Sequence, residues 1–85
     1  MQTFIYVIQD ELGVHARPAG LLVKEATKFT SDIKVTKGDK TADAKRLFGM
    51  LGLAAKKGDE LIFTIEGEDE EKALVEMEAF LKANL

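Results

Sequence analysis

The sequence predicts an α+β open-faced sandwich, in which three helices cover one face of a four-stranded antiparallel sheet. Strand-like runs, with apolar residues at every second position, alternate with runs that have apolar residues at helical spacing. Their order along the 85 residues is strand, helix, two strands, short helix, strand, helix. Gly38-Asp39 lies between the two consecutive strands and suits a two-residue hairpin turn. We therefore expect one domain, residues 1–85, built from two packed layers.

Four segments have the alternation expected of strands: residues 3–9, 31–36, 40–43 and 60–66. The side chains that this alternation directs toward the helices are Phe4, Tyr6, Ile8, Ile33, Val35, Leu61, Phe63 and Ile65. The opposite face carries Ile5, Val7, Ile62 and Thr64. Because that face is more apolar than contact with water requires, we expect a monomer that associates weakly through it at high concentration.

Two longer segments have the spacing of amphipathic helices: residues 16–28 and the segment that follows Asp69. Asp69 is a favourable N-cap, and Glu70 and Glu71 suit the positive end of a helix dipole. The residues expected in the two buried stripes are Ala19, Leu22, Val23, Ala26, Ala73, Leu74, Met77, Phe80 and Leu81.

Residues 47–53 form a third, much shorter helical segment that is apolar nearly all round. A helix of this length is marginal in water by itself, so tertiary packing must hold it. It cannot bury every side, and we expect some of its large side chains to be exposed as a contact patch. The alternative is a fully buried turn.

The composition excludes several classes of protein. The chain has 12 Lys and Arg against 15 Asp and Glu, a net charge of −3, which argues against nucleic-acid binding. No apolar run reaches the roughly 20 residues needed to cross a membrane, and no signal segment opens the chain. With no cysteine and one histidine, the sequence argues against disulfides and against a metal site. We expect a cytoplasmic protein without metal, cofactor, nucleic-acid partner or membrane insertion.

The stretch Gly13-Val14-His15-Ala16-Arg17-Pro18 contains the only histidine of the chain. A proline is tolerated in the first turn of a helix, so we expect the helix to start at Ala16 and His15 to be its N-cap. Ser, Thr, Asp or Asn would cap a helix better. A residue that breaks a local rule at an exposed helix start is a candidate functional residue, although it can also be an ordinary polar residue.

The start of a helix favours an anion, because its first N–H groups lack partners and the helix dipole is positive there. Arg17 adds a permanent charge that binds phosphate oxygens with two N–H groups. Histidine titrates near neutral pH, and its neutral ring is a nucleophile that forms covalent intermediates. These residues suit a phosphorylated His15 that Arg17 and the backbone amides of Ala16 and Arg17 stabilise.

The stretch Gly13 to Pro18 resembles the active-site segment of HPr, the histidine-containing phosphocarrier of the bacterial sugar phosphotransferase system. The resemblance extends to Ala42-Asp43-Ala44-Lys45, Leu47-Phe48-Gly49 and the closing segment Glu66 to Ala73. It implies the open-faced sandwich fold. It also implies that His15 takes a phosphoryl group on Nδ1 from phosphorylated enzyme I and passes it to enzyme IIA domains, with Arg17 stabilising the phosphate. Such a protein is a phosphoryl carrier rather than an enzyme.

The resemblance also implies a docking surface beside His15. Its apolar residues are Leu47, Phe48 and Leu51 of the short helix. From the residues themselves we add Gly20, Lys24 and Arg46 as docking candidates. Gly20 would allow a partner to approach closely, the alternative being simple tolerance of a small residue. Arg17, Lys24, Lys45 and Arg46 are candidates for a basic patch that steers an acidic partner, the alternative being a mixed solvated surface.

Arg46 stands where many family members carry a serine that a kinase phosphorylates for regulation. That regulation is excluded at this position, because arginine has no hydroxyl group. Arginine is also a poor N-cap, and its charge opposes the helix dipole. Three alternatives stay open: a carrier of the nitrogen-related branch, a regulator that binds transcriptional or metabolic proteins, and a non-covalent anion-binding or protein-binding module.

Overall fold

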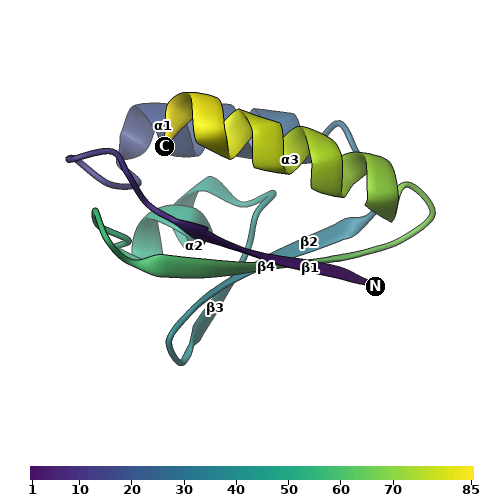
Figure 1. The fold of residues 1–85 in the computed structure, drawn as a ribbon, viewed down its shortest axis with the longest axis horizontal. Coiled ribbons are helices and arrows are strands. Elements are labelled where there is room, and N and C mark those ends of the chain that lie inside the picture. The colour runs from purple at the N-terminus through teal and green to yellow at the C-terminus, as the bar shows by residue number, and fades with distance from the viewer.

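The computed structural model describes residues 1–85 and confirms the predicted architecture (Figure 1). The elements are β1 (Gln2–Val7), α1 (Ala16–Ala26), β2 (Asp32–Lys37), β3 (Lys40–Asp43), α2 (Leu47–Gly52), β4 (Glu60–Glu66) and α3 (Glu70–Asn84). The strands form one antiparallel sheet in the order β1-β4-β2-β3. Helices α1 and α3 lie side by side above the sheet, and α2 packs against α1 and β3.

The core lies between the helices and the inward face of the sheet. The inward residues of β2 and β4 are fully buried, as their alternation predicts, and the Phe4 ring stacks on Phe63 with centroids 4.9 Å apart. From the helices, Leu22 of α1 and Met77 of α3 are buried in the same core. Tyr6, Val23, Leu74 and Phe80, which were expected in the core, are half-buried and pack against it. Burial of this apolar surface is the main force that holds the two layers together.

The bounds of four elements differ from the prediction. β1 ends at Val7 instead of residue 9, because the amides of Gln9 and Asp10 donate to the Leu85 carbonyl and leave the sheet. α1 ends at Ala26 instead of residue 28, where the amides of Lys28 and Phe29 bond three residues back and tighten the chain into a turn. β2 covers residues 32–37 instead of 31–36, and α2 ends one residue early, at Gly52.

Asp69 is the N-cap residue of α3, but its side chain does not cap the helix, which corrects the prediction. Its carboxylate instead accepts hydrogen bonds from the Thr30 amide (2.9 Å), the Ser31 amide (3.0 Å) and the Ser31 hydroxyl. Ser31 is fully buried. Asp69 therefore joins the start of α3 to the loop between α1 and β2, a contact between segments far apart in sequence.

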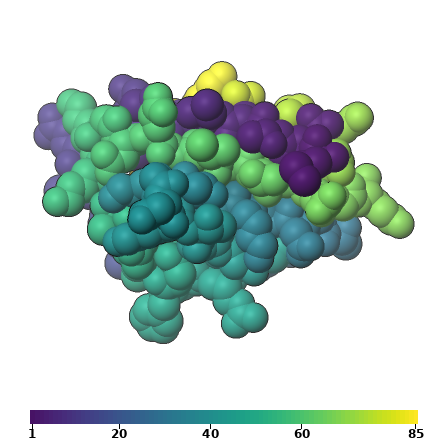
Figure 2. Space-filling view, turned by 90° about the horizontal axis from the view of Figure 1, so that it is seen from below, coloured from purple at the N-terminus to yellow at the C-terminus, as the bar shows by residue number.

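The face of the sheet opposite the helices is uncovered, and Figure 2 views the molecule from that side. Ile5 is 58% exposed there, and Val7 and Ile62 are each 37% exposed, as the alternation predicts. Thr64 is half-buried. No helix of the structure combines the length and apolar composition that a membrane crossing requires.

Candidate functional site

His15 is the N-cap of α1, so the predicted start of this helix is confirmed. Its backbone is extended (φ −102°, ψ −177°), and its carbonyl accepts the first helical hydrogen bond, from Ala19 at 2.9 Å. Its side chain does not cap the helix and makes no hydrogen bond. The imidazole is half-buried, so it is held by its surroundings and still open to a reacting group.

The loop before His15 is anchored to the segment between α2 and β4. The Val14 amide donates to the Ala55 carbonyl at 2.9 Å. Gly13 has a left-handed backbone (φ +68°), and a Cβ there would overlap the Ala55 oxygen and come within 2.8 Å of the Lys56 Cα. Glycine is therefore required at residue 13 both by conformation and by space.

The start of the same loop is closed by Asp10 and tied to the end of α3. The Gly13 amide donates to the Asp10 carbonyl at 2.9 Å, and the Leu12 amide donates to the Asp10 carboxylate at 2.8 Å. The Leu85 carbonyl accepts from the amides of Gln9 (2.6 Å) and Asp10 (2.8 Å). The loop is thus held at both ends, which limits where the imidazole can lie.

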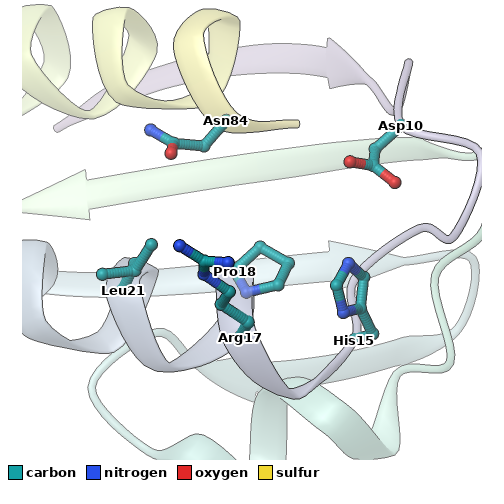
Figure 3. Close-up of a pocket in the computed structure, with 6 residues that line it drawn as sticks. All are labelled: Asp10, His15, Arg17, Pro18, Leu21 and Asn84. Carbon is teal, nitrogen blue, oxygen red and sulfur yellow. The ribbon is translucent and has the colours of Figure 1, made fainter.

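An open depression of about 290 Å³ surrounds the imidazole (Figure 3). Its lining residues are Asp10, His15, Arg17, Pro18, Leu21 and Asn84. Three elements supply them: the loop after β1, the first turns of α1 and the end of α3. Sequence reasoning placed His15 and Arg17 here but missed Asn84 and Leu21. No local pattern brings residue 84 to residue 15, because only the tertiary packing does so.

Several hydrogen-bond donors near the depression have no acceptor within the protein. The backbone amides of Ala16 and Arg17 donate to no protein acceptor, as expected in the first turn of a helix. The Arg17 guanidinium makes no ion pair and no hydrogen bond. In Figure 3 it extends along the helix toward Leu21 and away from the imidazole, with the Pro18 ring between them in that view. The cation is therefore free to rotate toward an incoming anion.

The exposed side of α2 matches the expected contact patch. Phe48 is 85% exposed and Leu47 is 36% exposed, whereas Met50 is fully buried. The alternative of a fully buried turn is therefore wrong. Leu51 is half-buried and packs against the core, so it presents less surface than the other two. Arg46 is the N-cap residue of α2 and makes no side-chain cap, in agreement with its low capping propensity.

The basic residues are more dispersed than the predicted patch. Lys45 does not belong to the patch, because its ammonium donates to the Phe29 carbonyl at 2.8 Å. Phe29 lies beyond the C-terminal end of α1, whereas His15 lies at its N-terminal end. Lys24 is exposed in the last turn of α1, roughly 13 Å along the helix from His15 at 1.5 Å per residue. Gly20 lies between them, and a Cβ at Gly20 would meet nothing within 4 Å. The chain itself thus imposes no steric need for glycine there.

Fold and site together define a small phosphocarrier domain. The chain belongs to the HPr family, because the family model described as "PTS HPr component phosphorylation site" matches residues 2–83. It is 45% identical over 73 residues to the phosphocarrier protein HPr of Lysinibacillus sphaericus, covering 86% of this chain and 83% of that protein. It is 41% identical over 75 residues to the HPr-like protein Crh of Bacillus subtilis, covering 88% of each. The crystal structure of HPr-C-His from Thermoanaerobacter tengcongensis superposes with a TM-score of 0.94 at 34% identity, covering 99% of this chain and 94% of that one.

Membership of this family gives the general function, that of a phosphocarrier of the phosphotransferase system. Its partners are, in general, proteins of that system. Of the two relatives, one is described as a phosphocarrier protein and the other as an HPr-like protein.

Proposed function

We propose that His15 accepts a phosphoryl group from phosphorylated enzyme I and passes it to enzyme IIA domains for sugar uptake. The observation that carries this proposal is the half-buried, unbonded imidazole at the start of α1, beside two free amides and an unpaired guanidinium. The two amides are in place before the phosphate arrives, so the Arg17 side chain is the one donor that must rotate toward it. The protein is then a covalent carrier and not an enzyme that turns over a substrate by itself.

The transfer is an in-line exchange of one P–N bond for another. The neutral Nδ1 of His15 attacks the phosphorus of a donor phosphohistidine that is protonated on its other ring nitrogen. The new bond forms as the donor bond breaks, and the donor ring leaves as neutral imidazole. The His15 ring takes up the positive charge that the donor ring gives up. The amides of Ala16 and Arg17 and the rotated Arg17 guanidinium bind the phosphoryl oxygens.

Partial exposure of the imidazole suits a carrier that must pass its phosphoryl group on to a second protein. A fully enclosed phosphate would bind more tightly and transfer more slowly, because interactions that stabilise the carrier state raise the barrier to the next step. The open depression lets each partner's reacting group approach His15 in turn. Leu47 and Phe48 offer exposed apolar surface for docking, with Arg46 exposed at the start of the same helix.

Incubation with phosphoenolpyruvate and enzyme I, followed by intact-mass measurement, tests the proposal. We expect one phosphoryl group on the natural chain and none on His15→Ala, with both chains unfolding at the same urea concentration. Arg17→Met should still accept phosphate but more slowly, by roughly 10- to 1,000-fold if it loses one charge-stabilising contact. A phosphorylated His15→Ala chain would contradict the assignment.

A regulatory role is the second candidate, and the observation that favours it is the match to Crh of Bacillus subtilis, which is described as a catabolite repression HPr. In this role the α2 surface would bind a regulatory protein without covalent transfer. A nitrogen-branch carrier would instead keep the phosphate on His15 but fail to supply sugar-specific enzyme IIA domains. Reconstitution with those domains separates these possibilities from the first proposal.

We also propose that the chain acts as a cytoplasmic monomer. The Crh crystal structure, 36% identical to this chain, was described as a swapped-domain dimer, so the monomer needs a direct test. β1 is an edge strand, and edge strands are the elements that most readily pair with another chain. Sedimentation over a wide concentration range should show one species of monomer mass at low concentration. A dimer that persists on dilution would contradict this.

A further inference from the structure

Lys37, at the end of β2, binds the segment that supports the His15 loop. Its ammonium donates to the Leu53 carbonyl at 3.0 Å and to the Ala54 carbonyl at 3.1 Å. It also lies 3.5 Å from the Asp59 carboxylate, and its side chain is only 29% exposed. All three partners belong to the segment between α2 and β4. One side chain therefore holds both ends of residues 53–59.

Ala54 is the one residue other than glycine in this chain with a positive φ, at +52°. It follows the C-cap of α2, Leu53, and its amide donates to the Leu51 carbonyl at 3.1 Å, which is a position where glycine is usual. A left-handed backbone is unfavourable for alanine, so surrounding contacts must stabilise it. α2 has no basic residue in its last turn, and Lys37 supplies from β2 the cation that the negative end of a helix favours.

The segment that Lys37 holds is the one on which the His15 loop rests. The Ala55 carbonyl, one residue after Ala54, accepts the Val14 amide at 2.9 Å. At the other end, the Asp59 carbonyl accepts the Ile8 amide at 3.0 Å. Figure 1 shows the loop after β1 and the loop before β4 at the same end of the molecule. The conformation of Ala54 orients the peptide group that joins it to Ala55, and so contributes to the position from which Ala55 presents its carbonyl.

We propose that Lys37 is a positioning residue for His15. Its ammonium stabilises the left-handed conformation of Ala54 and so directs the Ala55 carbonyl at Val14, the residue before His15. Lys37 touches neither the imidazole nor an incoming phosphoryl group. Its effect on phosphoryl transfer rests on the proposed function, whereas its effect on the loop does not.

Amide hydrogen exchange of Lys37→Met tests the positional claim without any phosphoryl donor. We expect the Val14 amide to exchange about tenfold faster than in the natural chain, while the buried amides of β4 change much less. Lys34→Met is the matched control. Lys34 lies on the same strand, its nearest acidic partner is Asp43 at 3.7 Å, and it makes no bond to residues 53–59. Its replacement should leave Val14 unchanged.

A second substitution distinguishes positioning from general stability. Ala54→Gly removes the cost of the left-handed conformation, so the double variant of Lys37→Met with Ala54→Gly should recover most of the Val14 protection. If Lys37→Met does not fold, a folded and protected double variant supports the proposal, and an unfolded one overturns it. Unchanged Val14 exchange in Lys37→Met, equal acceleration in β4, or no recovery on adding Ala54→Gly would each overturn it.

The rate of phosphoryl acceptance from enzyme I gives the functional readout. Lys37→Met should accept phosphate several-fold more slowly than Lys34→Met, because small displacements of a reacting group slow transfer. If the natural chain accepts no phosphate at all, the proposed function fails while the exchange experiment still tests Lys37. If transfer is normal in Lys37→Met although Val14 loses protection, Lys37 does not position His15, and the proposal is wrong.

Discussion

Replacing Gly13 by alanine tests whether the His15 loop is held by the contact that the structure shows. Two costs arise at this position. A left-handed backbone costs an alanine about 1–2 kcal/mol. The new Cβ would overlap the Ala55 carbonyl oxygen, which belongs to the backbone and cannot swing aside as a flexible side chain could. Relief of that overlap strains the loop by about 1–3 kcal/mol and weakens the Val14 hydrogen bond by about 1 kcal/mol.

Gly58→Ala is the matched control for this substitution. Gly58 also has a positive φ (+91°), in a turn closed by the Asp59 amide and the Lys56 carbonyl at 2.9 Å, but a Cβ there would meet nothing within 4 Å. Gly58→Ala should therefore carry only the conformational cost, about 1–2 kcal/mol. The whole effect of Gly13→Ala should be about 3–6 kcal/mol.

Urea unfolding of the two variants measures the difference directly. We expect Gly13→Ala to unfold at a clearly lower urea concentration than Gly58→Ala, with similar slopes for the two transitions. The amide signals of Val14 and His15 should shift in the first variant and stay in place in the second. Equal loss of stability in the two variants would refute the reasoning, because the overlap with Ala55 would then cost nothing.

Two further predictions concern stability. The hydrogen bonds of Asp69, above all the one from the Ser31 hydroxyl, lower its pKa from 3.8 to about 2. The stability that the ionised Asp69 carboxylate contributes is present above the pKa of this group in the unfolded chain, and it is lost as the pH falls toward 2. Asp69→Asn should therefore be less stable than the natural chain above about pH 4, and the gap should close toward pH 2 in unfolding experiments; a gap independent of pH would contradict this. Met77→Ala, at a fully buried position, should lose about 2–5 kcal/mol in urea, whereas Val75→Ala, 66% exposed on the same helix, should change by less than about 0.5 kcal/mol. Similar losses for the two would mean that the core does not lie where the structure places it.

Periodic patterns predicted the fold well, because alternation and helical spacing report which face of an element is buried. The bounds of β3 and β4 agree with the structure, and Pro18 placed the start of α1 at Ala16, with His15 as its N-cap. The end of β1 was less predictable, since it depends on a partner from elsewhere in the chain. Leu85, for example, withdraws the amides of Gln9 and Asp10 from the sheet.

The long-range polar contacts could not be predicted from the sequence. From sequence alone, a lysine at the end of a strand is interpreted as an ordinary surface residue, and an aspartate just before a helix as an N-cap. The Lys37 ammonium donates to two carbonyls that lie 16 and 17 residues away, and the Asp69 carboxylate accepts a hydrogen bond from Ser31, 38 residues away. Patterns of hydrophobicity carry no information on such pairs, because the pairing depends on how loops meet after the layers have packed. The position of the Arg17 guanidinium likewise depends on side-chain rotation rather than on spacing.

The central claim is that the imidazole of His15 is a transient covalent carrier of a phosphoryl group. Nitrogen NMR of the imidazole, recorded before and after treatment with phosphoenolpyruvate and enzyme I, tests it most directly. We expect the Nδ1 signal of His15 to change while the backbone signals of the sheet stay in place. Phosphate attached to any other residue, or an imidazole spectrum that does not respond to an active donor, would contradict the account.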